Sequence, residues 1–177
     1  MTVVVKGYSQ TTTCLLLAST YSGLDIVKYL IRHLNADVTT CVRGQETALH
    51  KACRSRVEAV EKVEFIVENY PFMAHAKTSH GTLPVHVAAR CDKVRCLEVL
   101  LKSDPASVNR ATSRGLTPLH IAAYFGCKNA VEFLLSWDYT DVNAQDLNED
   151  TPAHHAACYK HTESANFKAA LMHKQNI

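Results

Sequence analysis

The 177-residue sequence predicts an all-α solenoid, in which five helix–turn–helix units stack side by side and β-hairpin loops connect them. The first observation is a seven-residue string, residues 117–123, of which related copies begin at residues 13, 47, 83 and 151. The steps between the five copies are 34, 36, 34 and 34 residues. The second observation is that apolar residues follow the copies at helical spacing. A fixed period of this length indicates one small unit that buries its apolar face by stacking on its neighbours.

The fourth unit shows the plan of each element most clearly. Gly115 stands two residues before Thr117, where a tight hairpin needs a residue that accepts a positive φ. Thr117 can cap the first helix by accepting a bond from a backbone N–H of the opening turn. Pro118 then takes the first helical position, where its missing N–H costs nothing. Gly126 interrupts this helix, and an apolar stripe over residues 129–136 predicts the second helix.

The other units follow the same plan with departures. In the first unit the second helix is expected over residues 24–32. In the third unit Leu83 replaces the capping threonine, which should cost about 1 kcal/mol unless Thr82 substitutes for it. In the fifth unit Glu149 occupies the hairpin glycine position, and residues 162–171 match an apolar second helix poorly. We therefore expect the fifth unit to be a terminal cap or the cut edge of a longer array.

The string Thr-Pro-Leu-His-x-Ala, repeating at about 33 residues, resembles the ankyrin repeat. The resemblance covers nearly the whole chain as a single domain, with units at about 8–41, 42–77, 78–111, 112–145 and 146–177, the last of them atypical. It implies an L-shaped cross-section, in which hairpin tips and first helices line a concave groove. It also implies that the string histidines are buried and bond to the cap threonine and nearby backbone. The structural repeat residues are then Thr47, His50, Gly81, His86, Gly115, Thr117, Pro118, His120, Thr151 and His154.

Composition restricts the class of protein. The chain is 47% hydrophobic and 20% charged, which is typical of a folded domain, and its net charge of +2 is too small to indicate nucleic acid or a membrane surface. Seven cysteines without a Cys-x-x-Cys pair indicate neither a disulfide framework nor a zinc ribbon. Reduced thiols favour an intracellular, cytoplasmic protein, without excluding the nucleus. No apolar run approaches the roughly 18 residues of a membrane span, so we expect no membrane insertion.

The sequence predicts no catalytic residue, metal or cofactor. The spacing of His154, His155, Cys158 and His161 is similar to that of a metal site. The string histidine should point inward, however, which leaves at most three ligands without fixed geometry. No nucleophile elbow or catalytic-cysteine signature is present. The six glycines are scattered one per turn and cannot form a phosphate-binding loop.

The candidate partner-binding residues are those that the repeat register projects into the groove. They are Arg43, Arg54, Arg56, Lys77, His80, Arg90, Arg114, Leu116, Tyr124, Phe125, Asn148 and Tyr159. Arginine and aromatic side chains dominate the energetics of protein interfaces, so this set favours a partner with acidic residues beside one or two apolar or aromatic anchors. The alternative is that the charges are merely solvated and Phe125 packs on its neighbour. Glu58, Glu61, Glu64 and Glu68 form an acidic outer face that serves solubility.

Three functions remain open at the level of sequence. The favoured hypothesis is a monomeric, non-enzymatic module whose groove binds a segment of another protein. A second hypothesis is a structural segment of a larger protein such as a channel, kinase or adaptor, which the imperfect fifth unit favours. A third is nucleic-acid binding through the basic stripe, which predicts a steep salt dependence and which the small net charge disfavours.

Overall fold

The computed structural model describes residues 10–41 and 45–158 and places them in an array of helix pairs. The first helices of the units are α1 (Gln10–Tyr21), α3 (Ala48–Arg54), α5 (Pro84–Arg90), α7 (Pro118–Phe125) and α9 (Pro152–Cys158). The second helices are α2 (Leu24–His33), α4 (Ala59–Asn69), α6 (Val94–Ser103) and α8 (Lys128–Ser136). Two 3₁₀ helices, η1 (Pro71–His75) and η2 (Pro105–Asn109), follow α4 and α6.

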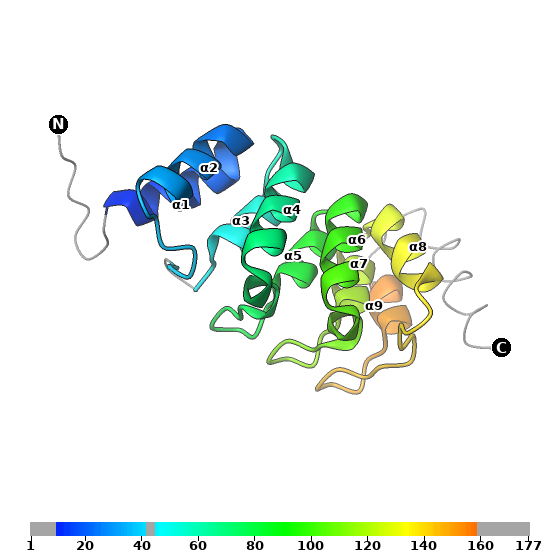
Figure 1. The fold of residues 1–177 in the computed structure, drawn as a ribbon. Helices are drawn as coiled ribbons and strands as arrows, with labels where there is room; N and C mark the ends of the chain where they lie inside the picture. Colours follow the sequence, from blue (N-terminus) through cyan, green and yellow to red (C-terminus); the bar gives the residue numbers. More distant parts are fainter. Residues whose placement is uncertain (1–9, 42–44, 159–177) are drawn as a thin grey trace.

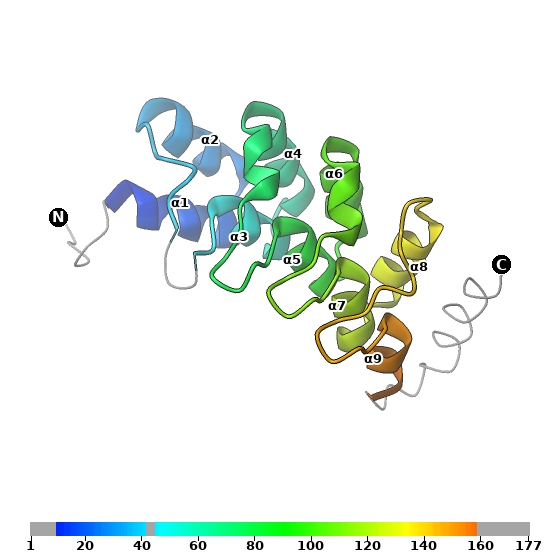
Figure 2. The same cartoon turned by 90° about the horizontal axis from the view of Figure 1, so that it is seen from below.

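The helices form two layers, and the loops between units project from one side of the array (Figure 1). Each first helix packs on the first helix of the next unit, and Figure 2 shows α1, α3, α5, α7 and α9 as one row beside α2, α4, α6 and α8. The core lies between the two layers and includes fully buried Leu49, Leu97, Leu119 and Leu134. The predicted all-α solenoid is therefore confirmed. The second half of the fifth unit lies outside the described residues.

The residues that begin and end the first helix of the fourth unit have the roles that the sequence predicts. The Thr117 hydroxyl accepts a bond from the His120 backbone N–H, and Pro118 opens α7. Gly126 ends that helix with a φ of 67°. The second helix begins at Lys128, one residue earlier than expected. In the third unit Leu83 offers no side-chain acceptor and is buried instead.

The hairpin glycines are required both by their backbone angle and by the space around them. Gly115 has a φ of 80°, and a Cβ at this position would lie 2.9 Å from the Asp146 Cα. The approach is close because neighbouring hairpins are bonded together, with the Leu147 N–H donating to the Arg114 carbonyl at 3.1 Å. Glu149 adopts a φ of 64° at the corresponding place in the next hairpin, where a side chain is strained. These bonds hold the tips of successive hairpins in fixed relative positions.

Three of the four string histidines are fully buried, as the resemblance implies: His50, His86 and His120. Each ring accepts the backbone N–H at the start of its own helix on Nδ1. The Nε2 atoms face backbone carbonyls of the next unit at 2.8–3.0 Å. Since a carbonyl only accepts, each Nε2 carries the proton. His154 also accepts the N–H of its cap threonine, Thr151, at 3.1 Å, but it corrects the expectation of burial because it is exposed: within the described chain no further unit follows to cover it.

None of the helices in the described ranges is long and apolar enough to cross a membrane.

Candidate functional site

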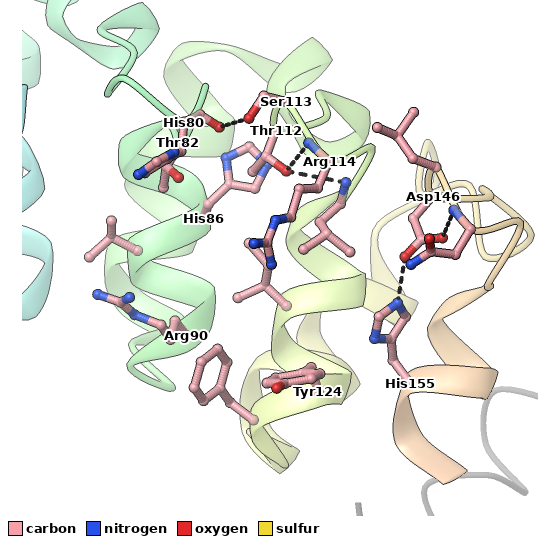
Figure 3. Close-up of a pocket in the computed structure, with 16 residues that line it drawn as sticks. His80, Thr82, His86, Arg90, Thr112, Ser113, Arg114, Tyr124, Asp146 and His155 are labelled. Carbon is pink, nitrogen blue, oxygen red and sulfur yellow. Dashed lines mark hydrogen bonds and ion pairs between the residues drawn. The ribbon is translucent and has the colours of Figure 1, made fainter. Parts of the chain in front are cut away.

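The main hollow on the concave side has a volume of about 800 Å³ and lies against α5, α7, α9 and three hairpin tips (Figure 3). It gathers seven of the residues that the sequence assigned to the groove. These are His80, Arg90, Arg114, Leu116, Tyr124, Phe125 and Asn148. Residues from the third, fourth and fifth units therefore share one surface, although they are up to 68 positions apart in the chain.

Cationic and aromatic groups meet in this hollow. The Tyr124 and Phe125 rings lie edge to face with centroids 5.1 Å apart. The guanidinium of Arg90 lies over the Phe125 ring, 6.0 Å from its centroid. Arg114 extends from a hairpin tip into the same hollow (Figure 3). Phe125 does pack on its neighbours, yet half of it (49%) stays exposed, so packing alone leaves a large apolar surface uncovered.

One wall of the hollow is fixed by a paired acid and base, Asp146 and His155. The His155 Nε2 lies 2.9 Å from one carboxylate oxygen, while the other accepts the backbone N–H groups of Asn148 and Asp150. Burial alone would raise the pKa of Asp146, but these hydrogen bonds lower it below its usual value. Asp146, Asp150 and His155 offer three metal-ligand atoms within 4.8 Å of one another. The hydrogen bonds of Asp146 account for this cluster, because they hold the hairpin at residues 146–150 against His155 of α9.

A second hollow of about 700 Å³ lies at the other end of the row, against α1, α3 and the turn after α3. Its lining is Leu16, Leu17, Thr20, Tyr21, Lys51, Arg54, Arg56 and Val57. Glu46 forms ion pairs with Lys51 and Arg54 beside it, the latter at 2.8 Å. Burial raises the pKa of Glu46, but the bond from Lys51 and the charge of Arg54 outweigh it, so the pKa is lowered. Two predicted groove residues, Arg54 and Arg56, thus belong to a separate hollow.

The remaining predicted residues lie elsewhere. Lys77 lines neither hollow, while Arg43 and Tyr159 are outside the described residues. The prediction missed lining residues at position five of the string. They are Leu17, Lys51, Val87, Ile121 and His155. This position follows the string histidine and varies from copy to copy, and that variation was the available signal.

Comparison with known families gives two matches. The family described as ankyrin repeats (3 copies) matches residues 60–146. The family described as ankyrin repeat matches residues 12–42. A comparison with curated proteins gave no match.

Proposed function

Because the chain belongs to the ankyrin repeat family, whose repeats generally mediate protein–protein interactions, we propose that its concave groove binds a segment of another protein. The stacked helices act as a rigid frame, and the non-repeating residues that face the groove supply affinity and specificity. On this proposal the chain acts as a monomeric, non-enzymatic module.

The observation that carries the proposal is the composition of the main hollow. Arg90 and Arg114 line it together with Tyr124 and Phe125, and Leu147, which is 74% exposed, lies at a hairpin tip. Exposed apolar groups that gather in one concavity indicate a binding site, whereas scattered ones do not. Arginine and aromatic residues are the types enriched among the residues that dominate binding energy. The charge favours a segment with acidic residues next to an apolar anchor.

Several cysteines and histidines that could serve in catalysis are buried in the core or bonded to the backbone. Cys53, Cys96 and Cys127 are buried, and burial raises the pKa of each thiol, to about 11 for Cys96 and Cys127. At neutral pH these groups are therefore protonated and weak nucleophiles. His86 and His120 have both ring nitrogens bonded to backbone groups. These bonds occupy the ring nitrogens that acid–base chemistry would need.

The test is affinity capture from the source cells with the full chain and with a double variant, Arg90→Glu with Tyr124→Ala. We expect the variant to lose the partner, because it reverses one groove charge and removes one aromatic face. The matched control is Arg95→Glu with Phe72→Ala, which changes exposed residues outside both hollows. Circular dichroism checks that all three proteins are folded. Equal recovery of the partner by the groove variant and the control would contradict the groove assignment.

A further inference from the structure

We propose that the groove binds one extended segment that carries two apolar anchors separated by an acidic stretch. This inference rests on the proposed function and specifies the chemistry of the partner. It follows from the order of apolar and basic side chains along the row of first helices.

The two hollows belong to one strip of the surface. Both are lined by position five of the string and by the residue that directly follows the string. The pairs are Leu17 and Thr20, Lys51 and Arg54, Val87 and Arg90, and Ile121 and Tyr124. These positions are three residues apart, so they lie on the same face of each helix. Since α1, α3, α5 and α7 pack in that order, the strip runs from the first unit to the fourth.

The strip is apolar at both ends. At the first unit Leu17 is 54% exposed and Tyr21 is 75% exposed, and Val57 lines the same hollow. At the fourth unit the edge-to-face pair of Tyr124 and Phe125 forms the corresponding surface. Two separate anchoring sites of similar chemistry therefore lie at the ends of the strip.

The middle of the strip is cationic, because Lys51, Arg54 and Arg90 lie on its second and third helices. Arg56 and Arg114 line the same two hollows, which together carry these five basic side chains. Among residues 10–41 and 45–158, the one carboxylate paired with them is Glu46, which bonds Lys51 and Arg54 and so leaves an excess of positive charge. Asp146, at the edge of the main hollow, is already bonded to His155. An acidic stretch between the anchors would complete the charge balance.

The same features favour a protein segment over a nucleic acid. Leu17, Val57, Val87, Ile121 and Leu116 are aliphatic lining residues, which suit side chains better than they suit stacked bases. The net charge of the chain is only +2, whereas phosphate binding needs many cations along the track.

The geometry also predicts the distance between the anchors. Packed helices lie about 8–10 Å apart, so three steps from α1 to α7 span roughly 24–30 Å. An extended chain covers about 3.3–3.6 Å per residue, which corresponds to roughly seven to nine residues. The two apolar residues of the partner should therefore be separated by about that number of positions.

The experiment measures fluorescence anisotropy of labelled synthetic peptides with the 177-residue protein. Each peptide has phenylalanine at both ends and a glutamate–serine spacer of about three, seven or twelve residues. We expect the seven-residue spacer to bind about tenfold more tightly than a peptide with one anchor, because the second contact becomes intramolecular. The three-residue spacer should bind no better than the single anchor. A seven-residue lysine–serine spacer should abolish binding.

Two protein variants test the assignment of the first anchoring site. Tyr21→Ala should lower the affinity for the matched peptide to that of the single-anchor peptide. Tyr139→Ala is the matched control, since Tyr139 is similarly exposed (71%) and lines neither hollow. Affinity that does not depend on spacer length, or that Tyr21→Ala leaves unchanged, would overturn the inference. So would tighter binding of a single-stranded oligonucleotide than of any peptide.

The outcomes separate this inference from the proposed function. If the double variant at Arg90 and Tyr124 loses its cellular partner while spacer length has no effect, the groove still binds a protein and the two-anchor pattern is wrong. If that variant keeps its partner, the groove assignment itself fails.

Discussion

Lys62 is a fully buried lysine at the fourth position of α4. The same position in the other second helices holds Val27, Leu97 and Val131, all of them completely buried. The Lys62 ammonium donates to the Ser19 and Ser22 carbonyls at 3.0 and 2.8 Å and to the Ser55 hydroxyl at 2.7 Å. It thus satisfies carbonyls at the end of α1, where a helix leaves them unpaired and favours a cation. Burial lowers the pKa of Lys62, against the attraction of Glu58 and Glu61.

Replacing Lys62 by methionine should destabilise the array although methionine suits an apolar position. The variant keeps the buried stem but leaves three acceptors without their donor, which should lower the free energy of unfolding by about 2–3 kcal/mol. Urea unfolding followed by circular dichroism measures the change. Lys102→Met is the control, because Lys102 is exposed on α6 and its ion pair with Glu98 contributes little. A stability equal to that of the parent would mean that apolar packing replaces these bonds.

Within the helical elements, two acidic residues cap a helix of a neighbouring unit. The Glu58 carboxylate accepts the Leu24 N–H at the start of α2 at 2.6 Å. The Asp92 carboxylate accepts the Ala130 N–H near the start of α8 at 2.7 Å. Both residues have a positive φ, 43° for Glu58 and 54° for Asp92, where the fourth unit has Gly126. The carboxylates thus link adjacent units at positions that glycine would fill with less strain.

Substitutions at Asp92 should separate the cap from the backbone strain. Asp92→Ala loses the cap and keeps a side chain at positive φ, so its stability should fall by about 1–2 kcal/mol. Asp92→Gly loses the same cap but relieves the strain, so it should be about 1 kcal/mol more stable than Asp92→Ala. Denaturant midpoints of the two variants and the parent measure both effects. Equal stability of the alanine and glycine variants would show that the backbone angle stores no strain.

Across the second to fifth units, the buried histidines join each unit to the next. His50 bonds the Thr82 carbonyl, His86 the Arg110 carbonyl and His120 the Asp150 carbonyl. Burial lowers the pKa of all three rings, to about 4 for His86. A proton on Nδ1 would also face the backbone N–H that this atom now accepts. The folded array therefore requires neutral histidines at every junction that they span.

The array should lose stability in mild acid. The unfolded chain takes up a proton on His86 near pH 6.5 and the folded chain only near pH 4, so stability is complete above pH 6.5 and declines as pH falls toward 4. His86 alone should cost up to about 3 kcal/mol over this window. His50 and His120 change stability in the same direction. Urea unfolding at several pH values measures the slope, and a slope of zero between about pH 6.5 and 4.5 would contradict the neutral histidine junctions.

A pair of variants tests whether His86 causes the loss of stability in acid. His86→Gln removes one buried ring and should flatten the pH dependence, whatever its stability at neutral pH. His33→Gln changes an exposed histidine on α2 and should leave the slope unchanged.

Much of the fold was predictable because its signals are local. Thr117, Pro118 and Gly126 fix a helix start and end within a few residues, and Gly115 fixes a turn. The candidate site was predictable in part, since its residues follow the repeat register. The sequence gives no distance between units, however, and so it did not separate Arg54 from Arg90 into different hollows.

The repeating unit and the stacking of its copies thus follow from the sequence, because caps, turns and apolar stripes act over short stretches of chain. The roles of the variable residues follow only from the folded array. Lys62 stands in the sequence between Glu61 and Glu64 of the predicted acidic face, yet its ammonium bonds carbonyls at the end of α1, and Glu58 caps α2 from the next unit. The groove likewise exists only once the hairpin tips are bonded to one another and the first helices lie in a row. The physical reason is that these contacts join residues more than thirty positions apart, and packing alone brings them together.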